Sequence, residues 1–529
     1  MEILWKEYIT IWIIGSVCFF AVVRWLRHGF FINLLCMGLA IYILWQSGLE
    51  TRIIVKFGMI AFLPLLLVNL VLFVFVAKEE GDTHIDPKYR VKFKVRKGSL
   101  VLDNIRRGIS IIGAAGSGKT ESVVYGLLKH FKAHKFCGVI HDYKDFEITE
   151  MAYPIFDDGK NPFYIISFDP IYAKVNPIAP KYIQDEESVH EVSRVLVENL
   201  LELKESGNSG NSRFFNDAAE GLIGGMMWRL KTDYEDYCTL PHLIALYQQL
   251  STKELVEFLS ANITSKAMAD AFINGKGSDR QTAGVKSTLS NAFKKISTQR
   301  IFMALSKDEV PLNINSGEDL SVICVVNNPK YETSLSPIIA TIIHTITKQM
   351  SVRNGRSSFL MMEEAPTIRL LNMHRVPATL RSYDIATIYV MQDKIQNDMM
   401  YGEKASRAIL SNLSYQFFGK TNDPDTAKYY ERFFEIIKKE TMSVSKGFNL
   451  NFDTRVTKGE KEVAKNRADT FYRLRQGEFV VFHDGKDKKV RFKTPKIKRE
   501  LKASELITKE MLKENFERIH REVRKIFGK

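Results

Sequence analysis

A glycine-rich stretch near residue 115 has the composition and spacing of a phosphate-binding loop. It fits the pattern G-x-x-x-x-G-K-T, and its members are Gly113, Ala114, Ala115, Gly116, Ser117, Gly118, Lys119 and Thr120. Glycines lack a Cβ, so the backbone can curl and aim successive N–H groups at phosphate oxygens. Lys119 is expected to reach the β- and γ-phosphates of ATP, and the Thr120 hydroxyl is expected to bind Mg²⁺.

The residues on either side of this loop are those of a strand and a helix. Ile109–Ile112 is a β-branched apolar run, and 121–130 carries apolar residues spaced for one helix face. Strand, glycine loop and helix form the context that the motif needs. The start of the helix adds a positive partial charge that favours phosphate. Glu121, which follows the loop directly, is included among the nucleotide-binding residues. The alternative is a glycine turn before an ordinary helix.

A pair of carboxylates follows a second apolar strand, at 359–362. Glu363 is predicted to face the Mg²⁺ ion, and Glu364 is predicted to be the catalytic base that polarises the attacking water. An acidic pair at a strand end can also be a plain surface feature. Its position after an apolar run, on a chain that carries a phosphate loop, favours the functional interpretation.

Three further residues are candidates for the same chemistry. Gln392 follows the apolar run 386–391 and could sense the γ-phosphate or position water, or it could simply cap a helix. Arg375 and Arg381 lie between the two strands. In ring NTPases an arginine reaches the γ-phosphate of a neighbouring subunit, and either residue could do this. A solvated helix face explains both arginines equally well.

Strand-like runs alternate with helical patterns through much of the chain, which indicates an α/β fold. Further strands are predicted at 91–95, 136–140, 163–168, 322–326 and 415–419, with a final hairpin, 478–483 and 489–492, that turns at Asp484-Gly485. We therefore expect a RecA-like, doubly wound P-loop NTPase domain over 90–185 and 308–495. Helical periodicity dominates 186–307, which predicts an all-α inserted domain. The segment 438–465 is interpreted as an exposed excursion of low order, and 496–529 as a basic helical tail.

The first 78 residues are predicted to be a transmembrane anchor. Apolar spans at 9–23, 30–45 and 57–77 are separated by short charged clusters, which suggests three helices. There are two alternatives to three membrane helices. One is two spanning helices plus one interfacial helix, and the other is a buried hairpin of a soluble protein. The basic loop at 24–28 is expected in the cytoplasm, which places the remainder beyond residue 78 there too. A cleaved signal peptide is not expected, because apolar spans continue past any such region.

Charge and cysteine content narrow the partners and the compartment. The chain has 75 Lys and Arg against 61 Asp and Glu, a formal charge of +14. This balance favours nucleic acid or anionic lipid as a partner, or it serves solubility alone. The five cysteines are scattered without a C-x-x-C pair, so we expect buried thiols in a reducing compartment, with neither a disulfide framework nor a zinc site.

The order of these motifs resembles that of the type IV secretion coupling proteins, the TraD/TraG-like conjugation ATPases. The resemblance covers most of the chain after residue 100. It is carried by Gly113–Thr120, Asp142-Tyr143-Lys144, Phe168-Asp169-Pro170 with Asn176-Pro177, the helical segment 278–293, Leu360–Ala365, Arg381 ahead of the strand that ends at Gln392, and the stretch from Tyr401 to Asn412. Three departures stand out: Glu363 replaces the usual aspartate, Asp142-Tyr143-Lys144-Asp145 replaces the usual D-P-K-G, and three spans replace the usual two.

The resemblance implies a homo-hexameric ring ATPase, multi-pass in the bacterial inner membrane, with its motor domain in the cytoplasm. Such a protein would receive a relaxase-bound single DNA strand, or relaxase or effector proteins, and hand them to the type IV secretion channel. The helical insertion would help to recruit this substrate. Two alternatives stay open. One is an FtsK/HerA-type DNA pump, which the lack of a C-terminal helix-turn-helix pattern disfavours. The other is a docking receptor that uses ATP only to assemble its ring.

Overall fold

The computed structural model describes residues 86–527, except 158, 160–161, 203–209, 275–278, 318–319 and 447–453, with scattered positions between 38 and 55. The chain divides into two compact units, 1–87 and 88–529. Nearly all of the predicted anchor at 1–78 lies outside the described residues, so it stays a prediction. Among the helices that the structure describes, none has the length and apolar character needed to cross a membrane.

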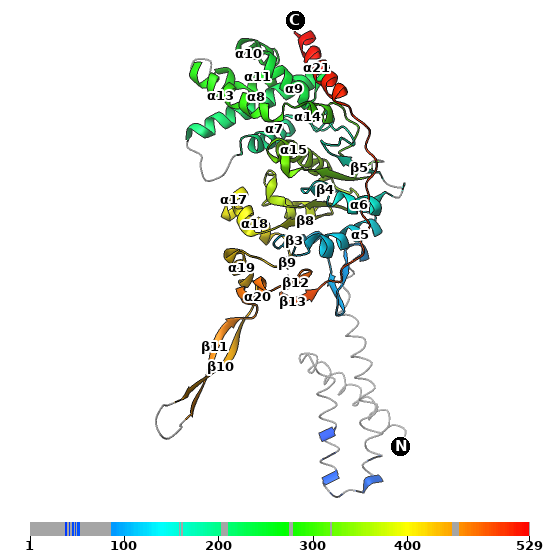
Figure 1. Ribbon diagram of the computed structural model, residues 1–529, viewed down its shortest axis with the longest axis vertical. Helices are drawn as coiled ribbons and strands as arrows, with labels where there is room; N and C mark the ends of the chain where they lie inside the picture. The colour runs from blue at the N-terminus through cyan, green and yellow to red at the C-terminus, as the bar shows by residue number, and fades with distance from the viewer. Residues whose placement is uncertain are drawn as a thin grey trace, which may run out of the picture. The chain divides into compact units, whose positions relative to one another are not determined.

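The second unit is built on a nine-stranded mixed sheet of order β13-β12-β9-β3-β8-β7-β4-β6-β5 (Figure 1). The strands from β9 to β5 are parallel, whereas β12 and β13 extend one edge in antiparallel fashion. The strand bounds are β3 (Ile109–Ile112), β4 (Cys137–Asp142), β5 (Phe163–Ile166), β6 (Val322–Val326), β7 (Ser358–Met362), β8 (Ile385–Met391), β9 (Tyr415–Phe418), β12 (Glu478–His483) and β13 (Lys486–Arg491).

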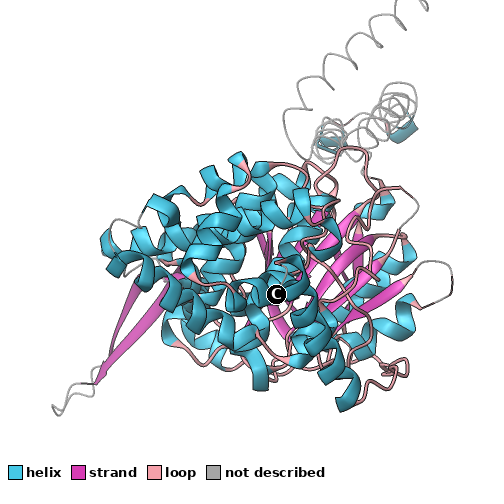
Figure 2. Cartoon of the chain, turned by 90° about the horizontal axis from the view of Figure 1, so that it is seen from above, coloured by secondary structure: helices cyan, strands magenta, loops and turns pink. Residues whose placement is uncertain are grey.

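The central strands are apolar because both faces of the sheet are covered. Every residue of β6, β7 and β8 is buried. Parallel strands buried on both faces read as continuous apolar runs, which is why the sequence predicts them well. Figure 2 shows helices flanking the strands. The strands predicted between 109 and 419 are confirmed, and so is the hairpin that turns at Asp484-Gly485.

The helices of the sheet region connect successive strands. A π-helical turn (Thr120–Val124) opens the helix after β3 and continues as α5. The other bounds are α5 (Tyr125–Ala133), α6 (Thr149–Phe156), α15 (Glu332–Met350), α16 (Val376–Arg381), α17 (Lys394–Tyr401), α18 (Glu403–Ser411), α19 (Pro424–Glu431) and α20 (Ala468–Tyr472), with 3₁₀ turns η2 (Pro87–Tyr89), η3 (Ile105–Arg107), η7 (Pro329–Tyr331) and η8 (Ala365–Thr367).

Between β5 and β6 the described residues form eight α-helices and no strand. Their bounds are α7 (Glu186–Leu200), α8 (Gly210–Asp233), α9 (Leu240–Gln249), α10 (Thr252–Ser260), α11 (Ile263–Met268), α12 (Asp270–Asn274), α13 (Asp279–Ile296) and α14 (Gln299–Ala304), with a 3₁₀ turn η5 (Glu235–Tyr237). α7 contacts both α8 and α15. The helical cluster is thus joined to the sheet region through a shared apolar core.

The expectation of low order at 438–465 is wrong for 438–446 and 454–464, and residues 447–453 lie outside the described part of the chain. Two strands, β10 (Ile436–Lys446) and β11 (Thr454–Ala464), pair along their whole length as an antiparallel ribbon. In the register of this ribbon, Val444 is paired with Val456 and Ser443 with Thr457. β-Branched residues therefore recur in both arms, and they favour strands even where polar residues surround them.

The first strand, β1 (Val91–Lys94), likewise pairs with its own partner, β2 (Ser99–Leu102), in a separate two-stranded sheet.

The chain ends in a helix, α21 (Lys509–Ile526), that follows an irregular segment from 493 to 508. α21 packs on α9 and α14 and buries Ile519 and Val523 against them. The helix of the basic tail is therefore confined to its second half, and it is docked on the helical cluster.

The packing at Gly138 predicts a stability effect. A Cβ on Gly138 would lie 2.5 Å from the ring of Phe359, which stacks on Phe131 with 4.2 Å between ring centroids. Gly138→Ala should lower the unfolding free energy by about 1–3 kcal/mol, because a close-packed core cannot absorb an added methyl group. Denaturant unfolding of the purified full-length chain measures this. Adding Phe359→Leu should recover part of the loss, and an unchanged midpoint in Gly138→Ala would contradict the packing argument.

Candidate active site

The glycine loop between β3 and α5 has the backbone shape that its sequence predicts. Gly116 (φ +73°) and Gly118 (φ +87°) adopt left-handed conformations that favour glycine. A Cβ on Gly118 would also lie 2.9 Å from the backbone nitrogen of Gly477, whose own N–H donates to the carbonyl of Ser117 at 2.9 Å. The turn before β12 therefore packs directly against the loop.

Two further backbone hydrogen bonds attach the loop to the strands beside β3. The N–H of Gly113 donates to the carbonyl of Met391, at the end of β8, over 3.2 Å. The N–H of Ala114 donates to the carbonyl of Lys420, just beyond β9, over 2.7 Å. The loop thus starts from a fixed position between both neighbouring strands.

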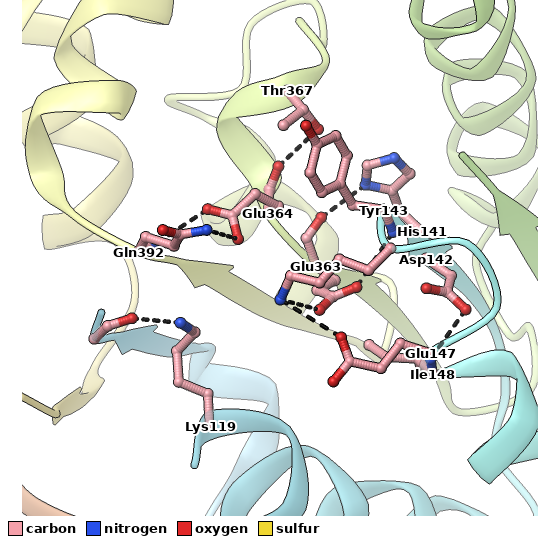
Figure 3. Close-up of polar contacts among 12 residues, drawn as sticks. Lys119, His141, Asp142, Tyr143, Glu147, Ile148, Glu363, Glu364, Thr367 and Gln392 are labelled. Carbon is pink, nitrogen blue, oxygen red and sulfur yellow. Dashed lines mark hydrogen bonds and ion pairs between the residues drawn. The ribbon is translucent and has the colours of Figure 1, made fainter. Parts of the chain in front are cut away.

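The Lys119 side chain is buried at the centre of the loop, with 6% of its surface exposed. Its ammonium group donates to the carbonyl of Gly113 and, over 3.4 Å, to that of Ala114 (Figure 3). Burial lowers the pKa of Lys119, and the nearby negative charge of Glu364 opposes this shift. The lysine therefore lies within electrostatic reach of the carboxylate that follows β7.

Thr120 and Glu121 begin the π-helical turn and are both partly buried. The carbonyl of Thr120 accepts the N–H of Tyr125, five residues on, which widens the first turn of the helix. The Ser117 hydroxyl is buried and has no hydrogen-bond partner in the described part of the chain. A hydroxyl in that condition is available to a ligand of the loop.

Glu363 and Glu364 are buried together at the carboxyl end of β7, with 1% and 2% of their surfaces exposed. The alternative of a surface acidic pair is therefore wrong. Glu364 has φ +46°, a left-handed conformation that is uncommon for a residue with a side chain. Strained backbone of this kind is often found at functional sites.

Gln392 lies beside Glu364 and holds its carboxylate from two directions. The backbone N–H and the side-chain amide of Gln392 each donate to a different oxygen of Glu364, both over 3.2 Å (Figure 3). The residue before Gln392 is Met391, whose carbonyl accepts from the glycine loop. The structure thus joins the loop, Gln392 and Glu364 in one hydrogen-bonded group, as the sequence-based hypothesis requires.

Glu363 has different partners. One carboxylate oxygen accepts from Lys144 over 3.0 Å and the other from the N–H of Tyr143 over 3.2 Å. Burial and the charge of Asp142 raise the pKa of Glu363 to about 7, although Lys144 acts against this shift. Lys144 also pairs with Glu147 over 3.6 Å. The D-x-K element is part of the family resemblance, but Lys144 is not among the predicted site residues; its place shortly after a predicted strand is the only local signal for it.

Asp142, at the end of β4, has a structural contact of its own. Its Oδ2 accepts from the N–H of Ile148 over 3.0 Å, and from the N–H and hydroxyl of Thr149 over 2.7 and 2.6 Å. These contacts fix the start of α6, although burial raises the pKa of Asp142 to about 6. His141 is fully buried and bonds to the carbonyl of Glu363 over 2.9 Å. Burial lowers the pKa of His141 to about 4, so this ring is neutral at pH 7.

The two candidate arginines are placed away from this group. Arg381 ends α16, four residues before β8 begins, whereas the glycine loop follows the opposite, carboxyl end of β3. Arg375 precedes the same helix, and the carbonyl next to it, that of His374, accepts from Asn412 at the amino side of β9. Both arginines thus lie toward the amino edge of the sheet. Neither completes the site of its own chain.

A model of the type IV secretion-system coupling protein DNA-binding domain matches residues 94–468, which is more than half of the chain. The chain belongs to this coupling protein family. The resemblance inferred from the motifs is therefore confirmed. No curated protein matches the sequence.

Solved structures of one coupling protein, TrwB, have the same fold at low sequence identity. The unbound monoclinic form of TrwBdeltaN70 is 12% identical, has a TM-score of 0.61, and the match covers 78% of this chain and 91% of that one. TrwB in complex with the non-hydrolysable ATP analogue ADPNP (12%, TM-score 0.57, 75% and 88%) and with ADP and Mg²⁺ (13%, 0.57, 75% and 87%) match similarly. They show that this coupling protein has the TrwB-like α/β fold.

The raised pKa of Glu363 predicts a pH-dependent stability. Its folded pKa of about 7 exceeds the ordinary value of 4.5, so folding favours the protonated form. Stability from this group is full below the unfolded pKa and falls, by on the order of 1–3 kcal/mol, as pH rises from about 4.5 to about 7. Glu363→Gln should flatten this fall in thermal melts at pH 5 to 8. Glu403→Gln, on the exposed face of α18, is the control; equal slopes in all three proteins would contradict the assignment.

Proposed function

We propose that this coupling protein is an ATP-hydrolysing motor with a RecA-like core. It would be anchored in the bacterial inner membrane and assemble as a homo-hexamer. Its task would be to pass a relaxase-bound single strand, or relaxase and effector proteins, into the type IV secretion channel. The observation that carries the enzymatic part is the convergence of the glycine loop, buried Lys119, Gln392 and the two buried glutamates at one edge of the sheet.

The residues of the site fit ATP with Mg²⁺. The loop has left-handed glycines, a buried ammonium group and a buried hydroxyl without a partner, which suit phosphate oxygens. TrwB was solved with an ATP analogue and with ADP and Mg²⁺. In this chain Thr120 and Glu363 would hold the metal ion, whose charge would offset that of the phosphates when bound. Glu363 would have to release Lys144 or share its carboxylate with it.

Glu364 is proposed as the base that orients and polarises the attacking water. Its carboxylate accepts hydrogen bonds from neutral donors of Gln392 and forms no ion pair with Lys144. The carboxylate therefore remains able to accept a proton from the attacking water. Gln392 would fix the direction of this carboxylate and so act as a positioning residue. Neither Arg375 nor Arg381 lies near the loop of its own chain. Either arginine would therefore act on the γ-phosphate in the site of a neighbouring subunit.

The sequence and the family support the membrane and cargo parts of this proposal. The apolar spans within residues 1–78 support an inner-membrane anchor with the second unit in the cytoplasm. The family model is named for a DNA-binding domain, and the formal charge of +14 suits a polyanion. Together these favour DNA over a protein-only substrate.

Substitutions at the loop and at the proposed base should separate ATP binding from hydrolysis. Lys119→Ala should weaken ATP binding by about 10- to 150-fold, because a charge-assisted hydrogen bond to phosphate is lost. Glu364→Gln should bind ATP normally but hydrolyse it at least about 100-fold more slowly. Binding of a fluorescent ATP analogue and phosphate release from the full-length chain measure the two steps. Normal hydrolysis by Lys119→Ala would remove the enzymatic proposal.

The same Glu364→Gln variant distinguishes a motor from a receptor. A docking receptor that uses ATP only to assemble its ring should still support substrate transfer in a conjugation assay. A motor should not, because transfer requires repeated hydrolysis. Thr367→Ala is a suitable control, since the Thr367 hydroxyl donates to the backbone carbonyl of Glu364 and leaves its carboxylate untouched.

Single-stranded DNA should bind mainly through its phosphates. Its affinity should fall about tenfold or more between 50 and 200 mM salt if three or more phosphates are contacted. Fluorescence anisotropy with a labelled oligonucleotide tests this. Binding that is absent, or unchanged across this salt range, would point to a protein-only substrate.

A further inference from the structure

A small pocket of about 160 Å³ lies at the carboxyl ends of β5 and β6, on the same edge of the sheet as the glycine loop but separated from β3 by β8, β7 and β4. Its walls are largely apolar, with Phe168, Ile301 and Leu335 among the lining residues. Asn327 and Asn328 also line the pocket. Apolar walls with a few amide groups are the surroundings that a nucleobase prefers, since its faces stack and its edge forms hydrogen bonds.

The rim of this pocket carries an exposed aromatic ring between two cations. Tyr331 is 37% exposed, and the Lys330 ammonium lies 5.3 Å from its ring centroid. The Arg300 guanidinium lies 6.0 Å from the same centroid. Hydrogen bonds from Arg300 and then Lys330 lower the pKa of the Tyr331 hydroxyl. An aromatic ring flanked by cations is the usual platform for single-stranded nucleic acid.

The rim is held in place by its backbone. The side chain of Asn328 accepts the N–H of Lys330 over 2.9 Å, and its carbonyl accepts the N–H of Tyr331 over 2.9 Å. This turn, η7, leads directly into α15. Tyr331 is therefore presented by a capped turn, and little further ordering is needed when a ligand stacks on it.

The carboxylates at the rim do not exclude a phosphate. Asp169 pairs with Arg300 over 2.8 Å, but the side chains are 50% and 45% exposed. Half-exposed ion pairs contribute little and are screened by salt, so a phosphate could replace Asp169 as the partner of Arg300. Asp145 also lines the pocket. The single base would enter between Tyr331 and the apolar wall, while its phosphates remain at the cationic rim.

We propose that this pocket holds one unpaired base of the single-stranded DNA substrate, with Tyr331 stacked on it and Arg300 and Lys330 at its phosphates. The proposal rests on the DNA-handling function proposed above and names the contact that would carry it. A paired base cannot enter, because its faces and its edge are occupied within the duplex. The pocket would thus select single-stranded over double-stranded DNA.

The test compares oligo-dT with an abasic oligomer of the same length, by anisotropy at one low salt concentration on the full-length chain. Tyr331→Ala should weaken oligo-dT binding by about 5- to 150-fold, the range expected for one stacked base. It should have little effect on the abasic oligomer, which keeps the phosphates and lacks the base. Tyr472→Ala is the matched control, because Tyr472 is 38% exposed on α20. Its binding should equal that of the parent chain.

A second variant keeps the test decisive if Tyr331→Ala does not fold. Tyr331→Trp should retain binding, and its indole fluorescence should be quenched by oligo-dT but much less by the mononucleotide dTMP or by duplex DNA. Equal quenching by dTMP at equal affinity would make this a free-nucleotide site and overturn the proposal. Parent-like binding of oligo-dT by Tyr331→Ala would overturn it too. If the parent chain itself fails to bind oligo-dT, both this proposal and the DNA-handling function proposed above are wrong.

Discussion

The site depends on the parallel register of three neighbouring strands, β3, β8 and β7. Ile112 pairs with Met391, and Met362 pairs with Tyr389, so the residues that follow each strand emerge at one edge of the sheet. Gln392 stands in the middle of this edge. The carbonyl before it accepts from the glycine loop, and its own two N–H groups hold Glu364. A shift of one residue in either pairing would turn these groups to the opposite face and separate them.

The two adjacent glutamates are distinguished by their partners rather than by their type. Glu363 meets a cation, Lys144, and a backbone N–H, while Glu364 meets the amides of Gln392. Burial and the charge of Asp142 raise the pKa of Glu363 to about 7, while Lys144 acts against this shift. The left-handed backbone at Glu364 is the local distortion that turns the second side chain away from the first.

Much of the fold and the core of the site could be predicted, because they depend on local sequence. Doubly buried strands such as β6 and β8 are uninterrupted apolar runs, and the glycine loop is constrained by its own backbone. The contact of Lys144 with Glu363 depends instead on which strands become neighbours, and nothing local to residue 144 shows that. The positions of Arg375 and Arg381 relative to the loop depend on strand direction in the same way. The β10–β11 ribbon is not predicted because its two arms are rich in polar residues and show no regular alternation of apolar and polar positions.

The pocket at Tyr331 and the carboxylate of Glu363 are joined by a short polar path. Tyr331 is followed by Glu332, whose carboxylate accepts the hydroxyl of Tyr143 over 3.1 Å, and the N–H of Tyr143 donates to Glu363 over 3.2 Å. A base that moved η7 would therefore act on the residue proposed to hold Mg²⁺. Such coupling is reciprocal: if DNA at Tyr331 strengthens the binding of Mg²⁺-nucleotide, the nucleotide must strengthen the binding of DNA by the same factor. Under the motor function proposed above, loss of the nucleotide after hydrolysis would weaken this contact and favour release of the strand.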